Sequence, residues 1–279
     1  MRGKERGGKS VRMQSLNDRV QEAEYSEAFV NVCTRFREQQ LKNQKNQEEN
    51  NMCVFQMGNL RIVDLTKELD PKTESRRCHL YRFNTGGPIP DFHTIMDLTS
   101  HLGTHCECPY HHDDNWPSVA DLPLTTFMGR AIYVDFKDTV APYTHITAAD
   151  LDRATEGKLQ EGDIVIIDSS YKLPPFTDAT NTKEDHRLLI GQESAEWFRD
   201  HKVKCVGFGD GVSIENSNED VKPFHDILMA ENIVFLEVLK NLDQLEKDVF
   251  FMSYSPLPIY GLDSCPVRVY AIEGLAEFS

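Results

Sequence analysis

The sequence has no run of about 18 apolar residues, so it lacks a segment of the length and hydropathy that a transmembrane helix needs. Its N-terminus also lacks the apolar core of a secretory signal, and we therefore expect a cytoplasmic protein without membrane association. Closely spaced cysteines are scarce. Cys106 and Cys108 are the only close pair among seven cysteines, a pattern typical of reduced thiols and not of a disulfide framework.

Basic residues are also few, because the sequence has 30 Lys and Arg residues against 45 Asp and Glu residues, which gives a net charge of −15. A protein that binds the phosphate backbone needs a basic face, so this balance argues against nucleic acid as a partner. The acidic excess does not in itself predict a cation site, since acidic surfaces usually serve solubility. The apolar content of 39% fits a globular chain with one sizeable core and an appendage.

The expected appendage is the polar N-terminal part of the chain, residues 1–59. A basic tail opens it, and apolar residues then recur at roughly helical spacing over residues 16–41. A stretch rich in Gln, Asn, Lys and Glu follows as a connector. We interpret this part as a helical extension that packs on a neighbour or a subunit, and we expect the compact domain over residues 60–279.

Short apolar runs and helical patterns alternate through that domain and predict the α/β class. We expect a long loop over residues 67–90, where charged residues, Pro and Gly gather. The predicted strands lie at residues 61–66, 131–136, 163–168, 204–208, 233–239 and 266–272, and the predicted helices at 148–155, 192–201 and 221–231.

One stretch, residues 100–112, holds an unusual density of chemically active groups: His101, His105, Glu107, His111 and His112. Imidazoles and a carboxylate are the groups that a divalent metal and a general acid or base need together. The odd-numbered members would share one face of an extended chain. Full extension would hold the first two histidines roughly 13 Å apart at their Cα atoms, too far to share one ion. We therefore predict a turn at Gly103, where glycine tolerates unusual dihedral angles.

Two other interpretations of this stretch stay open. A His-rich surface loop that binds nothing would contain the same residues. A structural zinc site could use Cys106 and Cys108, although their even positions would aim them away from the histidine face and the sequence has no second cysteine pair.

A second informative stretch carries Glu237 inside the apolar run at residues 233–239, after a predicted helix that contains His225. A carboxylate buried in a strand is costly unless a partner compensates its charge. A salt bridge to Arg268 is one such partner, and a metal ion is another. Together with the histidine-rich stretch, the pair favours a role as metal ligands.

The run His101-Leu-Gly-Thr-His105-Cys-Glu107-Cys-Pro109-Tyr-His111 resembles the H-x-G-T-H-x-D-x-P-x-H signature of the cyclase-like metal hydrolases. This is the family of bacterial kynurenine formamidase and isatin hydrolase. The resemblance covers nearly everything after residue 60. It implies an α/β domain with a partly open β-barrel of the swivelling β/β/α type, assembled as a homodimer or homotetramer.

Carried over by position, the resemblance implies that His101, His105 and Glu107 hold one metal ion. A second ion would lie between Glu107, His225 and Glu237, with Glu237 able to bridge both ions. Imidazole and carboxylate ligands suit zinc, with manganese as the alternative.

His111 matches the general acid or base of the family, whereas His112 matches no role. The family has aspartate where this chain has Glu107, and the added methylene moves the carboxylate by about 1.5 Å. The sequence therefore leaves one or two ions open.

The resemblance implies a metal-dependent hydrolase that cleaves the C–N bond of an arylformamide or a lactam. A metal ion polarises the carbonyl group and lowers the pKa of a bound water towards about 7, and a histidine exchanges the proton. The substrate is a small molecule whose identity the sequence does not reveal. The alternatives are lactone hydrolysis or ring closure at the same site, or a metal- or ligand-binding protein without catalytic activity.

Overall fold

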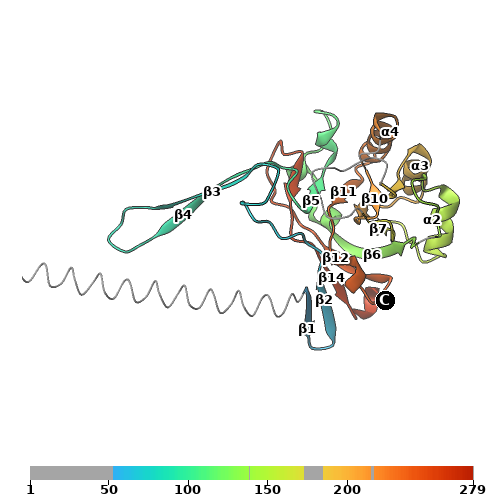
Figure 1. Cartoon of the computed structure of the whole chain (residues 1–279), viewed down its shortest axis with the longest axis horizontal. Helices are drawn as coiled ribbons and strands as arrows, with labels where there is room; N and C mark the ends of the chain where they lie inside the picture. The colour runs from blue at the N-terminus through green and yellow to red at the C-terminus, as the bar shows by residue number, and fades with distance from the viewer. Residues whose placement is uncertain (1–52, 138, 173–184, 215–216, 279) are drawn as a thin grey trace, which may run out of the picture. The chain divides into compact units, whose positions relative to one another are not determined.

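A computed structural model describes residues 53–137, 139–172, 185–214 and 217–278. A ten-stranded sheet forms its centre, and the four central strands β6, β7, β9 and β11 run parallel while all other pairings are antiparallel (Figure 1). In order across the sheet, the strands are β1 (Val54–Met57), β2 (Leu60–Asp64), β14 (Tyr270–Glu273), β12 (Val249–Ser253), β6 (Met128–Asp135), β7 (Ile164–Asp168), β9 (Cys205–Phe208), β11 (Val234–Glu237), β5 (His105–Glu107) and β13 (Ser264–Pro266).

The central strands are buried on both faces, which explains why they appear in the sequence as continuous apolar runs. Side chains alternate between two cores along each strand. In β7, Val165 and Ile167 pack in the core beneath the helices, while Ile164 and Ile166 pack in the opposite core. The second core also takes in residues of β2, β14 and β13, so both ends of the sheet contribute to it.

Three helices cover the first face: α2 (Ala148–Thr155), α3 (Gln192–Asp200) and α4 (Asn218–Met229). The first of them begins with a capping box, in which Thr147 accepts a hydrogen bond from the Asp150 backbone and the Asp150 side chain accepts one in return. Short elements complete the fold: β8 (Leu188–Leu189) pairs with β10 (Val212–Ser213), and 3-10 turns lie at η1 (Pro109–His111), η2 (Val119–Asp121), η3 (Leu124–Phe127), η5 (Leu242–Gln244) and η6 (Ala276–Phe278).

A hairpin extends away from the sheet, formed by β3 (Cys78–Asn84) and β4 (Phe92–Leu98) (Figure 1). The prediction of a loop throughout residues 67–90 is therefore wrong for β3. The cause is visible in the burial pattern, since only Cys78 of β3 is buried and apolar side chains occupy both faces of the hairpin. Sequence patterns detect a strand by the contrast between a buried and a solvated face, and this hairpin lacks that contrast.

All three predicted helices of the domain and the other predicted strands but one are confirmed within a few residues, and the mixed α/β class is confirmed with them. The exception is the strand predicted at residues 266–272, which is divided between the end of β13 and the start of β14, with residues 267–269 outside both. The barrel type stays a prediction. Cys53–Ser279 form one compact unit, which begins before the expected boundary at residue 60 because β1 pairs with β2. The predicted N-terminal helix lies outside the described residues. Within the described part of the chain, no helix is both long and apolar enough to cross a bilayer.

Candidate metal centre

Strand β5 carries His105 and Glu107 and lies between β11 and β13 in the sheet. Its register with β11 sets His105 opposite Glu237, so two stretches separated by more than a hundred residues meet on neighbouring strands. Helix α4 adds His225, whose ring packs edge-on against Phe235 of β11 at a centroid distance of 4.8 Å. The histidine-rich stretch and the predicted pair His225 and Glu237 thus occupy one buried site.

The chain turns sharply just before β5, at Gly103. Its φ of +58° lies in the left-handed region, and an added Cβ would come within 2.5 Å of Leu69. Thr104 then fixes the turn, because its hydroxyl donates to Val238 O and accepts from the Lys67 backbone N–H. The predicted turn at Gly103 is confirmed, and it brings the rings of His101 and His105 to a centroid distance of 5.1 Å.

Glu107 is the hub of the site. Its Oε1 lies 2.6 Å from His101 Nδ1 and 3.4 Å from His105 Nε2, and its Oε2 lies 3.7 Å from His225 Nε2. Glu237 Oε2 is 3.3 Å from His105 Nε2. Among the described residues, three groups have ligand atoms within 4.8 Å of one another and could hold an ion. Two of them, His101 with His105 and Glu107 and Glu107 with His225 and Glu237, are the ligand sets that the family resemblance implies. The third group consists of His101, His111 and Asp263.

The residues fit a cation in two respects. Glu107 Oε2 is buried and, among the described residues, has no hydrogen-bond partner, an arrangement that costs free energy unless a cation or another group compensates it. The two buried histidines also turn one nitrogen away from the centre. His105 donates from Nδ1 to Gly103 O and His225 donates from Nδ1 to Val221 O, each at 2.8 Å. In the neutral form of each ring, the lone pair is therefore on Nε2, which faces the carboxylates, as a metal ligand requires.

The electrostatics of the site show how strongly its members depend on one another. Burial alone would lower the pKa of His105, but hydrogen bonds to Glu107 and Glu237 outweigh burial and raise it to about 10. Burial would raise the pKa of Glu107, yet its contacts with three histidines hold that pKa well below the usual range. The pKa of Glu237 is raised by burial and by the charge of Glu107. Two buried carboxylates side by side need positive charge between them.

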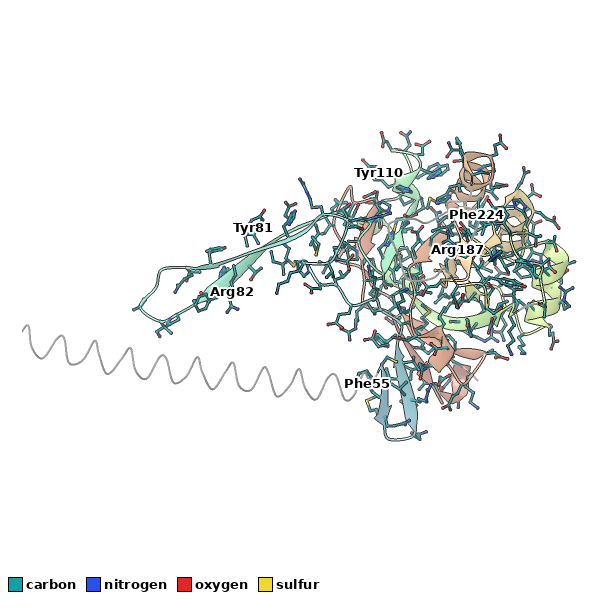
Figure 2. All side chains as sticks on the ribbon, viewed as in Figure 1. Phe55, Tyr81, Arg82, Tyr110, Arg187 and Phe224 are labelled. Carbon is teal, nitrogen blue, oxygen red and sulfur yellow. The ribbon has the colours of Figure 1, made fainter. Side chains whose placement is uncertain are left out.

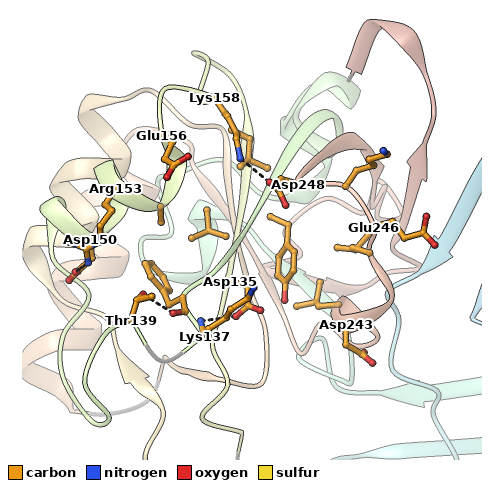
Figure 3. A pocket seen from close by; sticks show the side chains of 18 residues that line it. Asp135, Lys137, Thr139, Asp150, Arg153, Glu156, Lys158, Asp243, Glu246 and Asp248 are labelled. Atoms are coloured by element: carbon orange, nitrogen blue, oxygen red, sulfur yellow. Dashed lines mark hydrogen bonds and ion pairs between the residues drawn. The ribbon is translucent and has the colours of Figure 1, made fainter.

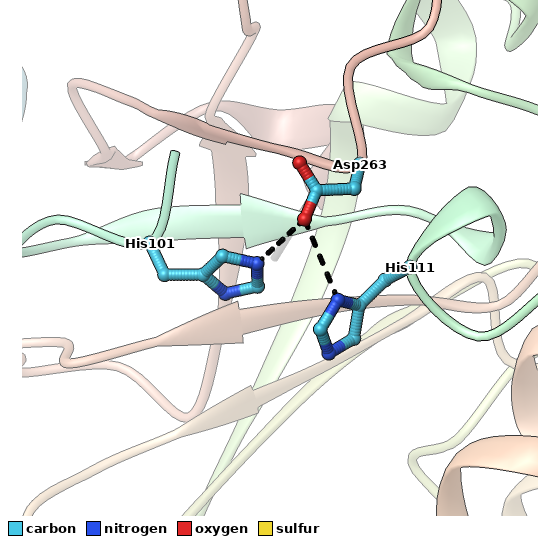
Figure 4. Close-up of side chains that lie close together, drawn as sticks. All are labelled: His101, His111 and Asp263. Carbon is cyan, nitrogen blue, oxygen red and sulfur yellow. Dashed lines mark hydrogen bonds and ion pairs between the residues drawn. The ribbon is translucent and has the colours of Figure 1, made fainter. Parts of the chain in front are cut away.

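His111 lies at the border of this centre, on η1, with its ring 4.6 Å from that of His101. Burial lowers its pKa, so the neutral imidazole is favoured near neutral pH. Its Nδ1 is 3.5 Å from Asp263 Oδ2, and the same oxygen is 2.8 Å from His101 Nε2 (Figure 4). The sequence analysis did not single out Asp263, because one aspartate in a loop carries no signal of its own until the fold brings it beside two histidines.

His112, which matches no family role, pairs with Asp226 at 2.8 Å and stacks on His225 with ring centroids 4.6 Å apart. It therefore borders the centre from the side of α4.

Two cavities open onto the centre, with volumes of about 240 and 570 Å³. His101 and Glu237 line both, and His111 lines the larger one. Arginines border the openings: Arg76 lines both cavities, Arg187 the smaller and Arg77 the larger. The centre is thus reachable by a small molecule, and at the openings Arg77 pairs with Asp97 and Arg187 with Asp185.

A further cavity of about 590 Å³ lies beside β6 and α2, and none of the predicted site residues lines it (Figure 3). Its walls carry acidic and basic side chains that largely pair with each other, such as Lys158 with Asp248 at 2.8 Å and Arg153 with Asp150. Ligand-binding sites are usually mostly apolar with a few convergent polar groups, which this cavity is not.

The structure also bears on the alternatives to a metal centre. Cys106 and Cys108 are fully buried in the second core, on the face of β5 opposite to His105 and Glu107, as their even positions predict. Arg268 pairs with Asp64 and not with Glu237. His105, Glu107, His225 and Glu237 are all buried, which excludes a surface loop for these four residues.

Comparison with known proteins places this centre in context. Residues 63–216 match the Cyclase family. The kynurenine formamidase of Salinibacter ruber is 28% identical over 175 residues, which cover 62% of this chain and 76% of that protein. Isatin hydrolase A from Ralstonia solanacearum has a similar structure, with a TM-score of 0.60 and 24% identity over 77% of this chain and 92% of its own. The predicted metal-dependent hydrolase from Bacillus stearothermophilus gives a TM-score of 0.57 at 22% identity, covering 77% of this chain and 99% of that one.

Proposed function

The chain belongs to the Cyclase family, and from this premise we propose that it is a metal-dependent hydrolase of non-peptide C–N bonds. The substrate class that we propose is an arylformamide or a lactam, in line with the kynurenine formamidase and isatin hydrolase to which the chain is similar. One observation carries the proposal. Three histidines, of which His105 and His225 are buried, and two buried carboxylates converge on a site where Glu107 Oε2 has no hydrogen-bond partner among the described residues.

The proposed ligands of one ion are His101, His105 and Glu107, and those of a second are Glu107, His225 and Glu237. Zinc is the first candidate and manganese the second, because both accept mixed imidazole and carboxylate ligands. When bound, such an ion supplies positive charge that polarises a carbonyl oxygen and lowers the pKa of water. The longer side chain of Glu107, compared with the aspartate of the family signature, sets whether one or two ions bind.

The protein's own residues carry the proton in this proposal. His111 is neutral near neutral pH and lines the larger cavity, so it can accept a proton from the attacking water. It then returns the proton to the leaving nitrogen.

Two other outcomes follow from the same geometry. Lactone hydrolysis or dehydrative ring closure would use the same polarised carbonyl, and a panel of N-formylkynurenine, isatin and simple lactones separates these reactions by which class turns over. A metal- or ligand-binding protein without catalytic activity is the other candidate, favoured by the substitution of Glu107 for aspartate. Hydrolysis that appears from nothing in the Glu107→Asp variant would support that candidate.

The experiment that tests the proposal is elemental analysis of purified protein for bound metal, combined with turnover of the same panel. We expect at least one equivalent of a divalent ion, and hydrolysis that a chelator abolishes and the ion restores. Metal-free protein that hydrolyses the preferred substrate at full rate would contradict the proposal.

The hairpin supports an assembly of two or more copies. Its exposed apolar side chains are Leu80, Tyr81, Phe83, Ile89, Phe92, Ile95 and Met96, and an isolated two-stranded hairpin is marginally stable in water. Figure 2 shows Tyr81 and Arg82 on this arm, away from the body of the sheet. A second copy of the chain is the proposed occupant. Two copies of net charge −15 repel each other over most of their surface, whereas this arm carries only Arg82, Asp91 and Asp97 as charged residues.

The form of the sheet supports the barrel type as well. Residues from both ends of the strand order, including Val63 of β2 and Cys265 of β13, pack in one core with those of the central strands. We therefore propose that this curled sheet is the partly open β-barrel of the swivelling β/β/α type.

A further inference from the structure

Asp263 lies at the border of the metal centre with one oxygen between two imidazoles. Oδ2 is 2.8 Å from His101 Nε2 and 3.5 Å from His111 Nδ1 (Figure 4). One of these histidines is a proposed metal ligand and the other is the proposed general acid or base. A single carboxylate therefore contacts both functions of the site.

The backbone holds Asp263 firmly in this position. Its carbonyl oxygen accepts a hydrogen bond from the Cys108 N–H at 2.9 Å, and the next residue, Ser264, is paired with Glu107 across the β5–β13 ladder. The hydroxyl of Ser264 donates to Ser100 O at 3.2 Å, which ties the same segment to the start of the histidine-rich stretch. The position of the carboxylate relative to Glu107 and His101 is consequently set by sheet pairing and not by a free loop.

His101 differs from the other two proposed histidine ligands in what lies behind it. His105 and His225 donate their outward N–H to neutral backbone carbonyls, whereas the outward nitrogen of His101 faces the charged carboxylate of Asp263. A carboxylate acceptor holds the imidazole in its orientation and makes it a stronger metal ligand. When an ion takes Nδ1 of His101, which lies 2.6 Å from Glu107 Oε1, the proton of this imidazole is on Nε2, where Asp263 accepts it.

The second contact orients His111. Its Nδ1 faces Asp263, so Nε2 is the nitrogen left for a proton exchanged with substrate. The rings of His101 and His111 lie 4.6 Å apart at an angle of 53°, and the carboxylate connects their edges.

His101, His111 and Asp263 also have ligand atoms close enough to hold an ion of their own. Such an ion would take the Nε2 atom of an imidazole whose Nδ1 already faces Glu107. It would also depend on two side chains, His111 and Asp263, that are each about one-third exposed. The geometry therefore favours orientation of His101 over a further ion.

We propose that Asp263 is a positioning residue that holds the ring of the metal ligand His101 in the orientation that binds the ion while it orients His111. The inference rests on the proposed function, because it assumes that His101 binds a metal. It adds the Asp263 carboxylate, which is distant in the sequence, to the site formed by the histidine-rich stretch.

The test is calorimetric titration of chelator-stripped, full-length protein with Zn²⁺, and separately with Mn²⁺, in the absence of substrate. The variants are Asp263→Asn, which removes the charge at constant shape, and Asp263→Glu, which restores it. Asp226→Asn is the matched control, because Asp226 also pairs with a histidine at 2.8 Å but that histidine, His112, is not a proposed ligand.

We expect Asp263→Asn to bind the ion about 10- to 100-fold more weakly with unchanged stoichiometry, as for other carboxylates behind histidine ligands. Asp263→Glu should recover most of this loss, and Asp226→Asn should stay within about threefold of wild type. Circular dichroism and thermal melting confirm that each variant is folded.

Equal metal affinity of wild type and Asp263→Asn would overturn the inference. So would the loss of one ion from the stoichiometry with the remaining affinity unchanged, since Asp263 would then be a ligand itself. Failure of the proposed function is recognised separately, because wild-type protein would bind neither ion, and the inference would fall with it.

Discussion

The centre around Glu107 and the β3–β4 hairpin differ from ordinary protein structure in opposite ways. Charged groups are usually exposed and large apolar side chains are usually buried. The centre buries two carboxylates and two imidazoles, whereas the hairpin exposes seven large apolar side chains. Both arrangements are unfavourable for an isolated chain, and each becomes favourable only with a partner of matching chemistry. We propose from this contrast that a cation completes the centre and another apolar surface completes the hairpin, so perturbing one partner should leave the other region unchanged.

The largest effect is expected for His105→Ala. His105 contacts both Glu107 and Glu237, and its removal leaves the two carboxylates without the imidazole between them. We expect bound metal to fall below one equivalent and hydrolysis to drop about a thousandfold, the several kcal/mol that a metal contributes to the transition state. Elemental analysis and turnover measure the two. His79→Ala, on the exposed hairpin, is the control and should change neither, whereas full metal content in His105→Ala would refute the ligand assignment.

Metal removal should separate the two regions by stability. An ion that binds only the folded state stabilises it by about 2.7 kcal/mol when its concentration is 100 times its Kd. We therefore expect a chelator to lower the Tm of wild-type protein and added ion to raise it in proportion to the logarithm of its concentration. The same additions should leave the Tm of His105→Ala unchanged. If the Tm of wild-type protein does not change with the ion concentration, the centre does not bind the ion.

The hairpin should respond to a different change. Ile95→Lys places a charge on an exposed apolar side chain of β4, and we expect it to shift the mass in light-scattering chromatography towards the monomer. Metal content should stay at the wild-type level. Leu124→Lys is the matched control, because Leu124 is equally exposed on the body of the protein and should leave the mass unchanged. A monomeric wild-type protein would show that the hairpin has no second copy as its partner.

The smallest effect concerns the contact of Arg82 with the ring of Phe92, whose centroid lies 4.6 Å from the guanidinium carbon. A cation–π contact at an exposed site contributes about 0.5–1 kcal/mol. We expect Arg82→Ala to speed hydrogen exchange of the backbone amides in β3 and β4 up to about fivefold, while amides of β5 and β11 keep their protection. Faster exchange in β5 would show that the two regions are coupled.

The same comparison explains what could be predicted from the sequence. The centre can be predicted from the sequence because a buried charge needs a partner that compensates it. Glu237 within an apolar strand and the spacing around Gly103 both indicate such a site. Helix α2 can be predicted equally well, because Thr147 and Asp150 form a local capping signal. Each of these signals lies within a few residues of the structure that it specifies.

The hairpin and the role of Asp263 could not be predicted, because neither has a signal in the local sequence. Strand β3 lacks the alternation of buried and solvated positions by which a strand is recognised, so its charged and Gly-rich surroundings predicted a loop. Asp263 gains its role only through the pairing of β13 with β5, which joins residues that lie more than 150 positions apart. Such long-range contacts have no local trace in the chain.

The central claim is that imidazoles and carboxylates from β5, α4 and β11 share a cation. A crystal of the purified protein, measured at the zinc and manganese absorption edges, tests it most directly. The account predicts an anomalous peak about 2.1 Å from His105 Nε2, in contact with Glu107. A map with no peak there, in protein that hydrolyses its substrate, would contradict the account.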